Sequence, residues 1–204
     1  MDERYTNKVT CIVTNGTNLL LIKHPFAGYQ LPAGTVEADE EPLAAAIRET
    51  KEETSLKDVS LIKCLGVMEV GLPGGMACLL ETSTIYSRPD KTSFDWATIP
   101  RSSWVKVLRQ SGGWTQINYS EPDCLPNPNF ETYSLTGWVE REKLAKCQKR
   151  HFYHFGSKHV GTNPWCVFSD YHMFEVGWHR LDSLPQLMPP QDQWLAFALE
   201  RMEK

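Results

Sequence analysis

The sequence predicts an α+β protein in which β-strands outnumber helices. Its 204 residues include 13 glycines and 13 prolines, a content that provides many turns and disfavours a helical bundle. Short runs rich in β-branched and other apolar residues recur along the chain, whereas long helical periodicity is confined to residues 41–54 and the carboxyl end. Residues 81–146 contain β-like runs and no long helical pattern. We therefore expect a sheet with few helices and an additional all-β region.

The first two strands form a predicted hairpin. Residues 8–14 are rich in β-branched side chains, Asn15-Gly16 is a strong turn signal, and residues 18–23 provide the returning strand. A glycine-rich break at 71–75 separates two further strands. The other strands of the main sheet are expected at residues 59–70, 76–85, 151–155 and 171–179.

Two segments have the spacing of amphipathic helices. In residues 41–54, Leu43, Ile47 and Thr50 recur every three or four positions behind Pro42, which is favourable in the first turn of a helix. Apolar residues repeat at the same spacing in 191–202, and we interpret that second helix as core packing.

Composition argues against several classes of protein. With 21 basic and 25 acidic residues the net charge is −4, which excludes binding to nucleic acid through bulk positive charge. No stretch approaches the roughly 18 apolar residues of a membrane span, and the amino terminus lacks the apolar region of a secretory signal. Six widely spaced cysteines without a CxxC pair disfavour a disulfide framework and predict a cytoplasmic location.

The acidity is concentrated in one segment. Residues 37–53 hold seven acidic and two basic residues, a local charge of −5. On the predicted helix, Glu49, Glu52 and Glu53 stand at i, i+3 and i+4 and so share one face. A solvated surface is one reading, but like charges at this spacing each cost roughly 0.2–0.5 kcal/mol. Oxygen ligands on a rigid element suit Mg²⁺ or Mn²⁺, and the periodicity alone leaves both readings open.

The spacing within this segment is more specific than its charge. The pattern G-x5-E-x7-R-E-U-x-E-E-x-G-U is matched by Gly34, Glu40, Arg48, Glu49, Glu52, Glu53 and Leu56. The segment resembles the Nudix box, the signature of hydrolases that act on nucleoside diphosphates linked to another moiety. The resemblance implies a loop–helix–loop placed over a mixed β-sheet in an α/β/α sandwich, formed here by residues 1–80 and 147–204.

Two residues depart from the pattern. Thr50 replaces an aliphatic residue and is expected to face the packing side of the helix. Ser55 replaces a glycine that would adopt a left-handed conformation after the helix, and serine in that conformation costs about 1 kcal/mol. Neither change removes a carboxylate.

The resemblance also implies roles for individual residues. Glu49, Glu52 and Glu53 are the expected metal ligands, with Glu40 as a further contributor. Arg48 would orient a neighbouring carboxylate, and Gly34 would allow close approach of the backbone to metal or phosphate. The physical reason is that the charge of a diphosphate repels a water nucleophile until cations neutralise it.

Residues outside the box complete the candidate site. A general base from a separate loop is common in such enzymes, and the candidates are Asp170 and Glu175. Tyr29 and Trp165 are candidates for stacking on a base of the substrate, with core packing as the alternative. The spacing of His151, His154 and His159 also permits zinc, but alternating strand positions explain it without a metal.

Residues 81–146 have features of their own. A turn at 85–90, then Val105-Lys-Val-Leu, Ser111-Gly-Gly-Trp and Thr136-Gly-Trp-Val, resemble a bacterial SH3-like domain. Five short strands packed around Trp114 and Trp138 would form a small all-β barrel inserted in the Nudix fold. The alternative is an elaborate insertion loop of the catalytic domain. Such an insert could cap the site, bind a protein or peptide partner, or mediate a homodimer.

The leading hypothesis is a Mg²⁺- or Mn²⁺-dependent pyrophosphohydrolase. Its substrate would be a small molecule such as a nucleoside triphosphate, a nucleotide sugar or a dinucleoside polyphosphate, and the 5′ end of RNA presents the same bond. The rival hypothesis is a non-catalytic nucleotide-sensing or protein-binding module on the same fold. Retention of three acids at metal-ligand positions disfavours this rival, because sensing alone does not require them.

Overall fold

The structure is a computed structural model of the 204-residue chain, and it describes residues 4–124, 127–159, 161, 163–169 and 171–203. The chain divides into two compact units. We call the first the two-helix unit, which comprises Lys8–Met68 and Arg150–Lys204. We call the second the β unit, which comprises Met1–Asn7 and Glu69–Lys149.

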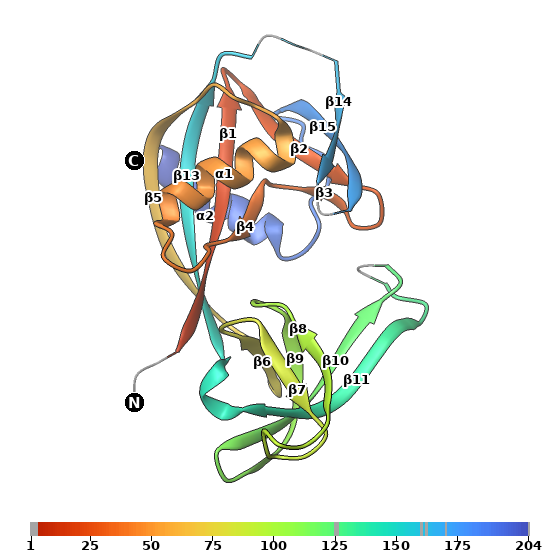
Figure 1. Cartoon of the computed structure of the whole chain (residues 1–204). Helices are drawn as coiled ribbons and strands as arrows, with labels where there is room; N and C mark the ends of the chain where they lie inside the picture. The colour runs from red at the N-terminus through yellow and green to blue at the C-terminus, as the bar shows by residue number, and fades with distance from the viewer. Residues whose placement is uncertain (1–3, 125–126, 160, 162, 170, 204) are drawn as a thin grey trace. The chain divides into compact units, whose positions relative to one another are not determined.

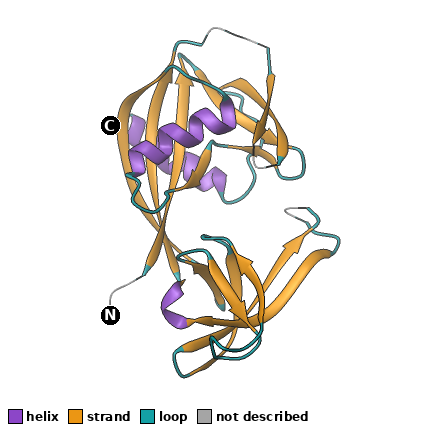
Figure 2. Ribbon diagram, viewed as in Figure 1, coloured by secondary structure: helices purple, strands orange, loops and turns teal. Residues whose placement is uncertain are grey.

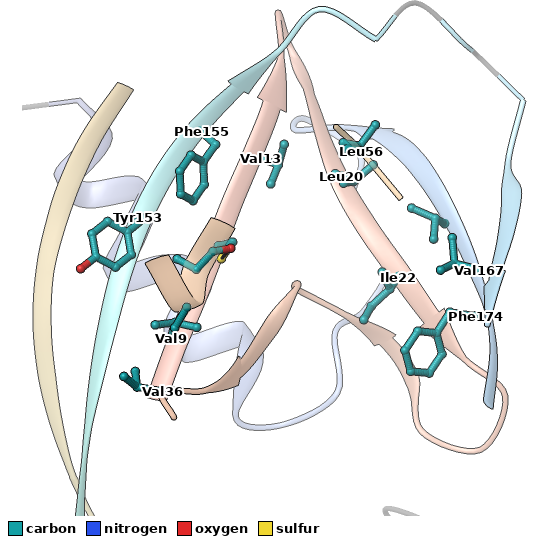
Figure 3. Packing of buried hydrophobic residues seen from close by; sticks show 14 residues of the cluster. Val9, Val13, Leu20, Ile22, Val36, Leu56, Tyr153, Phe155, Val167 and Phe174 are labelled. Atoms are coloured by element: carbon teal, nitrogen blue, oxygen red, sulfur yellow. Dashed lines mark hydrogen bonds between the residues drawn. The ribbon is translucent and has the colours of Figure 1, made fainter. Parts of the chain in front are cut away.

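The two-helix unit is built on a sheet of eight strands (Figure 1). The sheet has the order β14-β15-β2-β1-β13-β5, and β3 and β4 pair with β2 and β1. The strands are β1 (Tyr5–Asn15), β2 (Asn18–His24), β3 (Gly28–Gln30), β4 (Ala33–Thr35), β5 (Val59–Gly71), β13 (Cys147–Ser157), β14 (Trp165–Ser169) and β15 (His172–Arg180). Strands β2 and β1 are antiparallel, whereas β1 and β13 run in the same direction (Figure 3), so the sheet is mixed as expected.

Helices α1 (Pro42–Thr54) and α2 (Gln191–Met202) cover the two faces of this sheet (Figure 2). Alternation along the strands separates two cores. Leu20 and Ile22 belong to the core under α1, together with Ala45 and Ala46 of that helix (Figure 3). The core under α2 contains Leu19, Leu21, Phe152, Leu195 and Ala198. Helix, sheet and helix thus form three layers.

The ends of α1 follow from its sequence. Pro42 occupies the start of the helix, where its missing N–H leaves no hydrogen bond unmade. Ser55 ends the helix in the left-handed conformation, with φ of 58°, and its N–H donates to the Lys51 carbonyl at 2.8 Å. Thr50 is fully buried and its hydroxyl donates to the Ala46 carbonyl. The predictions for both departures from the box are confirmed.

The predicted hairpin is also confirmed, with Asn15 opposite Asn18 and Gly16 at φ of 59°. The single strand predicted at 76–85 is wrong, because the chain turns after Leu79 and forms β6 (Met76–Leu79) and β7 (Ser83–Tyr86) instead. Strands β8 (Asp95–Ile99), β12 (Leu144–Ala145) and β14 are at most five residues long and were not predicted.

The β unit contains a sheet of seven strands in the order β12-β6-β9-β10-β11-β7-β8. The strands are β6 (Met76–Leu79), β7 (Ser83–Tyr86), β8 (Asp95–Ile99), β9 (Trp104–Ser111), β10 (Trp114–Pro122), β11 (Glu131–Glu140) and β12 (Leu144–Ala145), and a 3₁₀ helix spans Arg141–Lys143. The core is aliphatic: it comprises Ala77, Leu79, Ile85, Ile99, Val105, Ile117, Val139 and Leu144. The expectation of a core around Trp114 and Trp138 is therefore wrong.

The compact β unit and the expected insert have different boundaries. The unit starts at Glu69 rather than at residue 81, ends at Lys149, and includes the first residues of the chain. The assignment of residues 81–146 to an SH3-like barrel stays a prediction. None of the six cysteines, all of which lie among the described residues, is in a disulfide bond. Among the described residues, neither helix is long and apolar enough to cross a membrane.

Candidate functional site

The predicted site residues converge on the side chain of Arg48, in the middle of α1. Its Nε and Nη2 donate to the two carboxylate oxygens of Glu40, each at 2.9 Å. Its Nη1 donates to Glu49 at 2.9 Å and to Glu52 at 3.2 Å. One guanidinium therefore binds three of the predicted carboxylates, which is a more central role than orienting one neighbour.

This arrangement changes the proton affinity of its members. Hydrogen bonds from Arg48 are the main cause of a lowered pKa of the Glu40 carboxyl, and the Glu37 N–H adds to it at 2.9 Å. The same contacts raise the pKa of Arg48 further above its ordinary value. Glu40 and Arg48 are therefore both charged near neutral pH, and a bidentate fork holds Glu40 in place.

The loop before α1 is fitted closely to the acidic face. The Thr35 N–H donates to Glu49 at 3.2 Å, and the Ala33 N–H donates to Glu53 at 2.9 Å. A Cβ atom on Gly34 would stand 1.9 Å from the Glu49 carboxyl carbon. Only glycine leaves room for the carboxylate, so in this structure Gly34 permits close approach of Glu49 to the backbone.

Burial differs sharply among the carboxylates. Glu53 is 7 % exposed, whereas the Glu52 side chain is 53 % exposed. Beneath α1, burial is the main cause that raises the pKa of the Cys11 thiol to about 12, and the negative charge of Glu53 adds to it. Glu53 thus lies at the base of the site and Glu52 at its solvent face.

The donor chemistry suits a hard divalent cation, but the side chains do not converge on one point. Within the described ranges, no three His, Cys, Asp or Glu side chains are arranged to hold a metal ion. Glu40 is the least suitable ligand because both of its oxygens accept bonds from Arg48. The Glu52–Arg48 contact is a solvent-exposed i,i+4 pair, a class worth about 0–1 kcal/mol, so rotation of Glu52 has a small cost.

The other predicted residues have structural contacts of their own. Trp165 packs on the core under α1 and donates its indole N–H to the Thr54 carbonyl at 2.8 Å, which caps the end of α1. Tyr29 packs on the core under α2, with its ring edge to His179. Glu175 is exposed on β15. Asp170 lies outside the described residues, so its role as general base stays a prediction.

Sequence reasoning missed two participants, Lys8 and Thr35. They lie opposite each other in the pairing of β1 with β4, and Lys8 donates to the Thr35 hydroxyl at 2.5 Å. The Thr35 carbonyl also accepts from Arg48 at 2.9 Å. No sequence signal could identify these residues, because they meet only through pairing of strands that are far apart in the chain.

Residues 4–77 match the family model described as NUDIX domain. The chain is 39 % identical over 72 residues to an RNA pyrophosphohydrolase of Pelagibacter ubique (strain HTCC1062). That match covers 33 % of this chain and 46 % of the relative, so less than half of the relative's length is represented.

A solved structure is also similar. The MutT protein from Methanosarcina mazei Go1 aligns over 98 % of this chain and 97 % of that protein, with 15 % identity and a TM-score of 0.43. Residues 4–77 are therefore similar to the NUDIX domain family, and the curated relative that this chain matches in part is an RNA pyrophosphohydrolase.

Proposed function

We propose that this protein is a Mg²⁺- or Mn²⁺-dependent hydrolase that cleaves the pyrophosphate bond of a nucleoside diphosphate linked to another moiety. The observation that carries the proposal is the acidic face of α1, where Arg48 gathers Glu40, Glu49 and Glu52 beside Gly34. Clustered carboxylates are the ligands that a hard divalent cation prefers, and such a cation neutralises the charge of a phosphate.

The residues of the site have distinct roles in this proposal. Glu49, Glu52 and Glu53 supply oxygen ligands, and Glu40 holds Arg48 in place rather than binding metal. Arg48 keeps Glu49 oriented and partly neutralises the cluster before the cation binds. The divalent cation, when bound, neutralises phosphate charge and lowers the pKa of the attacking water.

The proposed substrates share one feature, the pyrophosphate bond. Nucleoside triphosphates, nucleotide sugars and dinucleoside polyphosphates all contain the scissile bond. The Pelagibacter relative is named for action on RNA, so an RNA with a 5′-triphosphate is a further candidate substrate. A panel of these compounds, assayed by chromatography for all phosphorylated products of hydrolysis with Mg²⁺ and with Mn²⁺, tests the proposal. Absence of turnover across the panel would favour the sensing module instead.

The first variant to examine is Glu52→Gln. Glu52 is exposed, so the substitution should leave thermal unfolding unchanged while removing one charged ligand. We expect turnover to fall by at least about 100-fold, equivalent to roughly 2.7 kcal/mol. Glu142→Gln in the 3₁₀ helix of the β unit is the matched control and should retain full turnover. Equal activity of the two variants would refute the assignment of Glu52.

We also propose that the β unit is a separate module whose SH3-like character allows a protein or peptide partner or a homodimer. Its own sheet and aliphatic core support this idea. The Leu72 N–H donates to the Lys146 carbonyl at 2.9 Å, so a linker of a few residues can replace 72–146. We expect the shortened chain to give a cooperative thermal transition and near-native circular dichroism. Aggregation would indicate that the β unit is an integral part of the hydrolase core.

The expected cytoplasmic location stays part of this proposal, and its basis is the cysteine pattern.

A further inference from the structure

The β unit contains a cavity with a volume of 460 Å³ that the proposed hydrolase site does not use. All of its lining residues belong to the β unit. Its floor is formed by the core residues Ala77 and Leu144 with the neighbouring Ala145, each less than 10 % exposed. A concave, partly apolar space of this size is suited to a small organic molecule.

The rim of the cavity is cationic. Arg4, Arg141 and Lys146 line it, and none of its described lining residues is acidic. Three acids of this unit are paired elsewhere: Glu69 with Lys149, and Glu81 and Glu140 with Lys143. Within the part of the chain that the structure describes, the three rim cations form no ion pair with a carboxylate. Three positive charges around one cavity repel each other unless an anion is present.

A residue that lines the cavity has an unpartnered hydroxyl. Thr115 on β10 is 1 % exposed, and its buried Oγ1 has no hydrogen-bond partner among the described residues. A buried hydroxyl without a partner costs free energy, so such groups are rare. Thr115 and the core residue Ile117 are two positions apart on β10 and share a face, so Thr115 lies on the side of the aliphatic core.

We propose that this cavity binds a phosphate monoester with a small organic part of nucleoside size or less. The phosphate carries a charge near −2 and matches the rim, where arginine donates in pairs to phosphate oxygens. The organic part contacts the apolar floor, and one of its polar atoms hydrogen-bonds to the Thr115 hydroxyl. This site is separate from the carboxylate cluster, and its proposed ligand binds without a divalent cation.

Calorimetric titration of the full-length protein in EDTA tests the proposal, with adenosine 5′-monophosphate, adenosine and inorganic phosphate as probes. We expect the monophosphate to bind at a 1:1 ratio and more tightly than either fragment. Lys146→Gln should weaken that binding by roughly tenfold, equivalent to about 1.4 kcal/mol. The matched control, Lys106→Gln on β9, removes the same charge outside the cavity and should leave the affinity unchanged.

The variant Thr115→Val separates a binding role from a structural one. Valine keeps the shape and removes the unpartnered hydroxyl, so thermal stability should stay equal or rise while affinity for the monophosphate falls several-fold. Unchanged affinity in Thr115→Val would overturn the role of the hydroxyl. Equal affinity in Lys146→Gln and Lys106→Gln, or no binding of the monophosphate at millimolar concentration, would overturn the proposal as a whole.

Discussion

The two units of this protein carry candidate sites of opposite charge. In the two-helix unit, one guanidinium is surrounded by carboxylates and hydrogen-bonds to three of them. In the β unit, three cations line a cavity, and no acidic side chain is among its described lining residues. The acidic site is therefore partly neutralised by its own Arg48, whereas the basic cavity depends on a ligand for neutralisation. The first can be stable without its cation, and the second is expected to gain stability when an anion binds.

Substitution of an arginine in each site gives the largest expected contrast. Arg48→Gln removes the cation that joins Glu40, Glu49 and Glu52, so the free energy of unfolding should fall by about 2–4 kcal/mol. Arg4→Gln in the cavity relieves repulsion among cations and should change the free energy of unfolding by no more than about 0.5 kcal/mol. Urea unfolding of the two variants measures the difference, and equal losses would remove the contrast between the sites.

The free energy of unfolding of wild type and that of Arg48→Gln should depend differently on pH. Arg48 lowers the pKa of Glu40 below its ordinary value of 4.5, so this contact stabilises the fold above that pH. The stabilisation is lost as pH falls through the lowered pKa. The stability difference between wild type and Arg48→Gln should therefore be largest above pH 4.5 and should shrink below it.

The two units also differ in the space around one of their glycines. Gly34→Ala would displace the Glu49 carboxylate, which is held by Arg48 and by the Thr35 N–H, and should lower the free energy of unfolding by about 1–3 kcal/mol. Gly113→Ala in the β unit meets no atom within 4 Å and should have an effect below about 0.5 kcal/mol. Thermal unfolding compares the two, and a tolerated alanine at residue 34 would show that Glu49 can move without cost.

The smallest effect concerns two serines in left-handed conformations. Ser55→Gly at the end of α1 should stabilise the protein by about 1 kcal/mol, because glycine adopts this conformation without strain. Ser102→Gly in the β unit relieves the same strain at φ of 66° and also removes a buried, unpartnered hydroxyl. Its gain in denaturant titration should therefore be equal or larger. A loss at either position would contradict the assignment of strain.

Local features were predictable from the sequence, and non-local ones were not. The limits of α1, the left-handed Ser55 and the Gly16 hairpin depend on neighbouring residues, and the structure confirms them. The turn after Leu79 and the aliphatic core of the β unit depend on which strands pair, and the sequence analysis predicted neither of them. Trp165 shows the same limit, because its bond to the Thr54 carbonyl joins residues 111 positions apart.

The acidic face of α1 follows from local sequence, because residues three and four positions apart on a helix are neighbours whatever the rest of the chain does. The glycine that precedes this helix and the family to which the segment is similar are also readable from local sequence. The bond from Arg48 to Glu40, eight residues away, and the gathering of Arg4, Thr115, Arg141 and Lys146 around one cavity require the folded chain. Those residues are brought together by strand pairing and loop closure, whose register depends on the burial of whole faces rather than on local sequence.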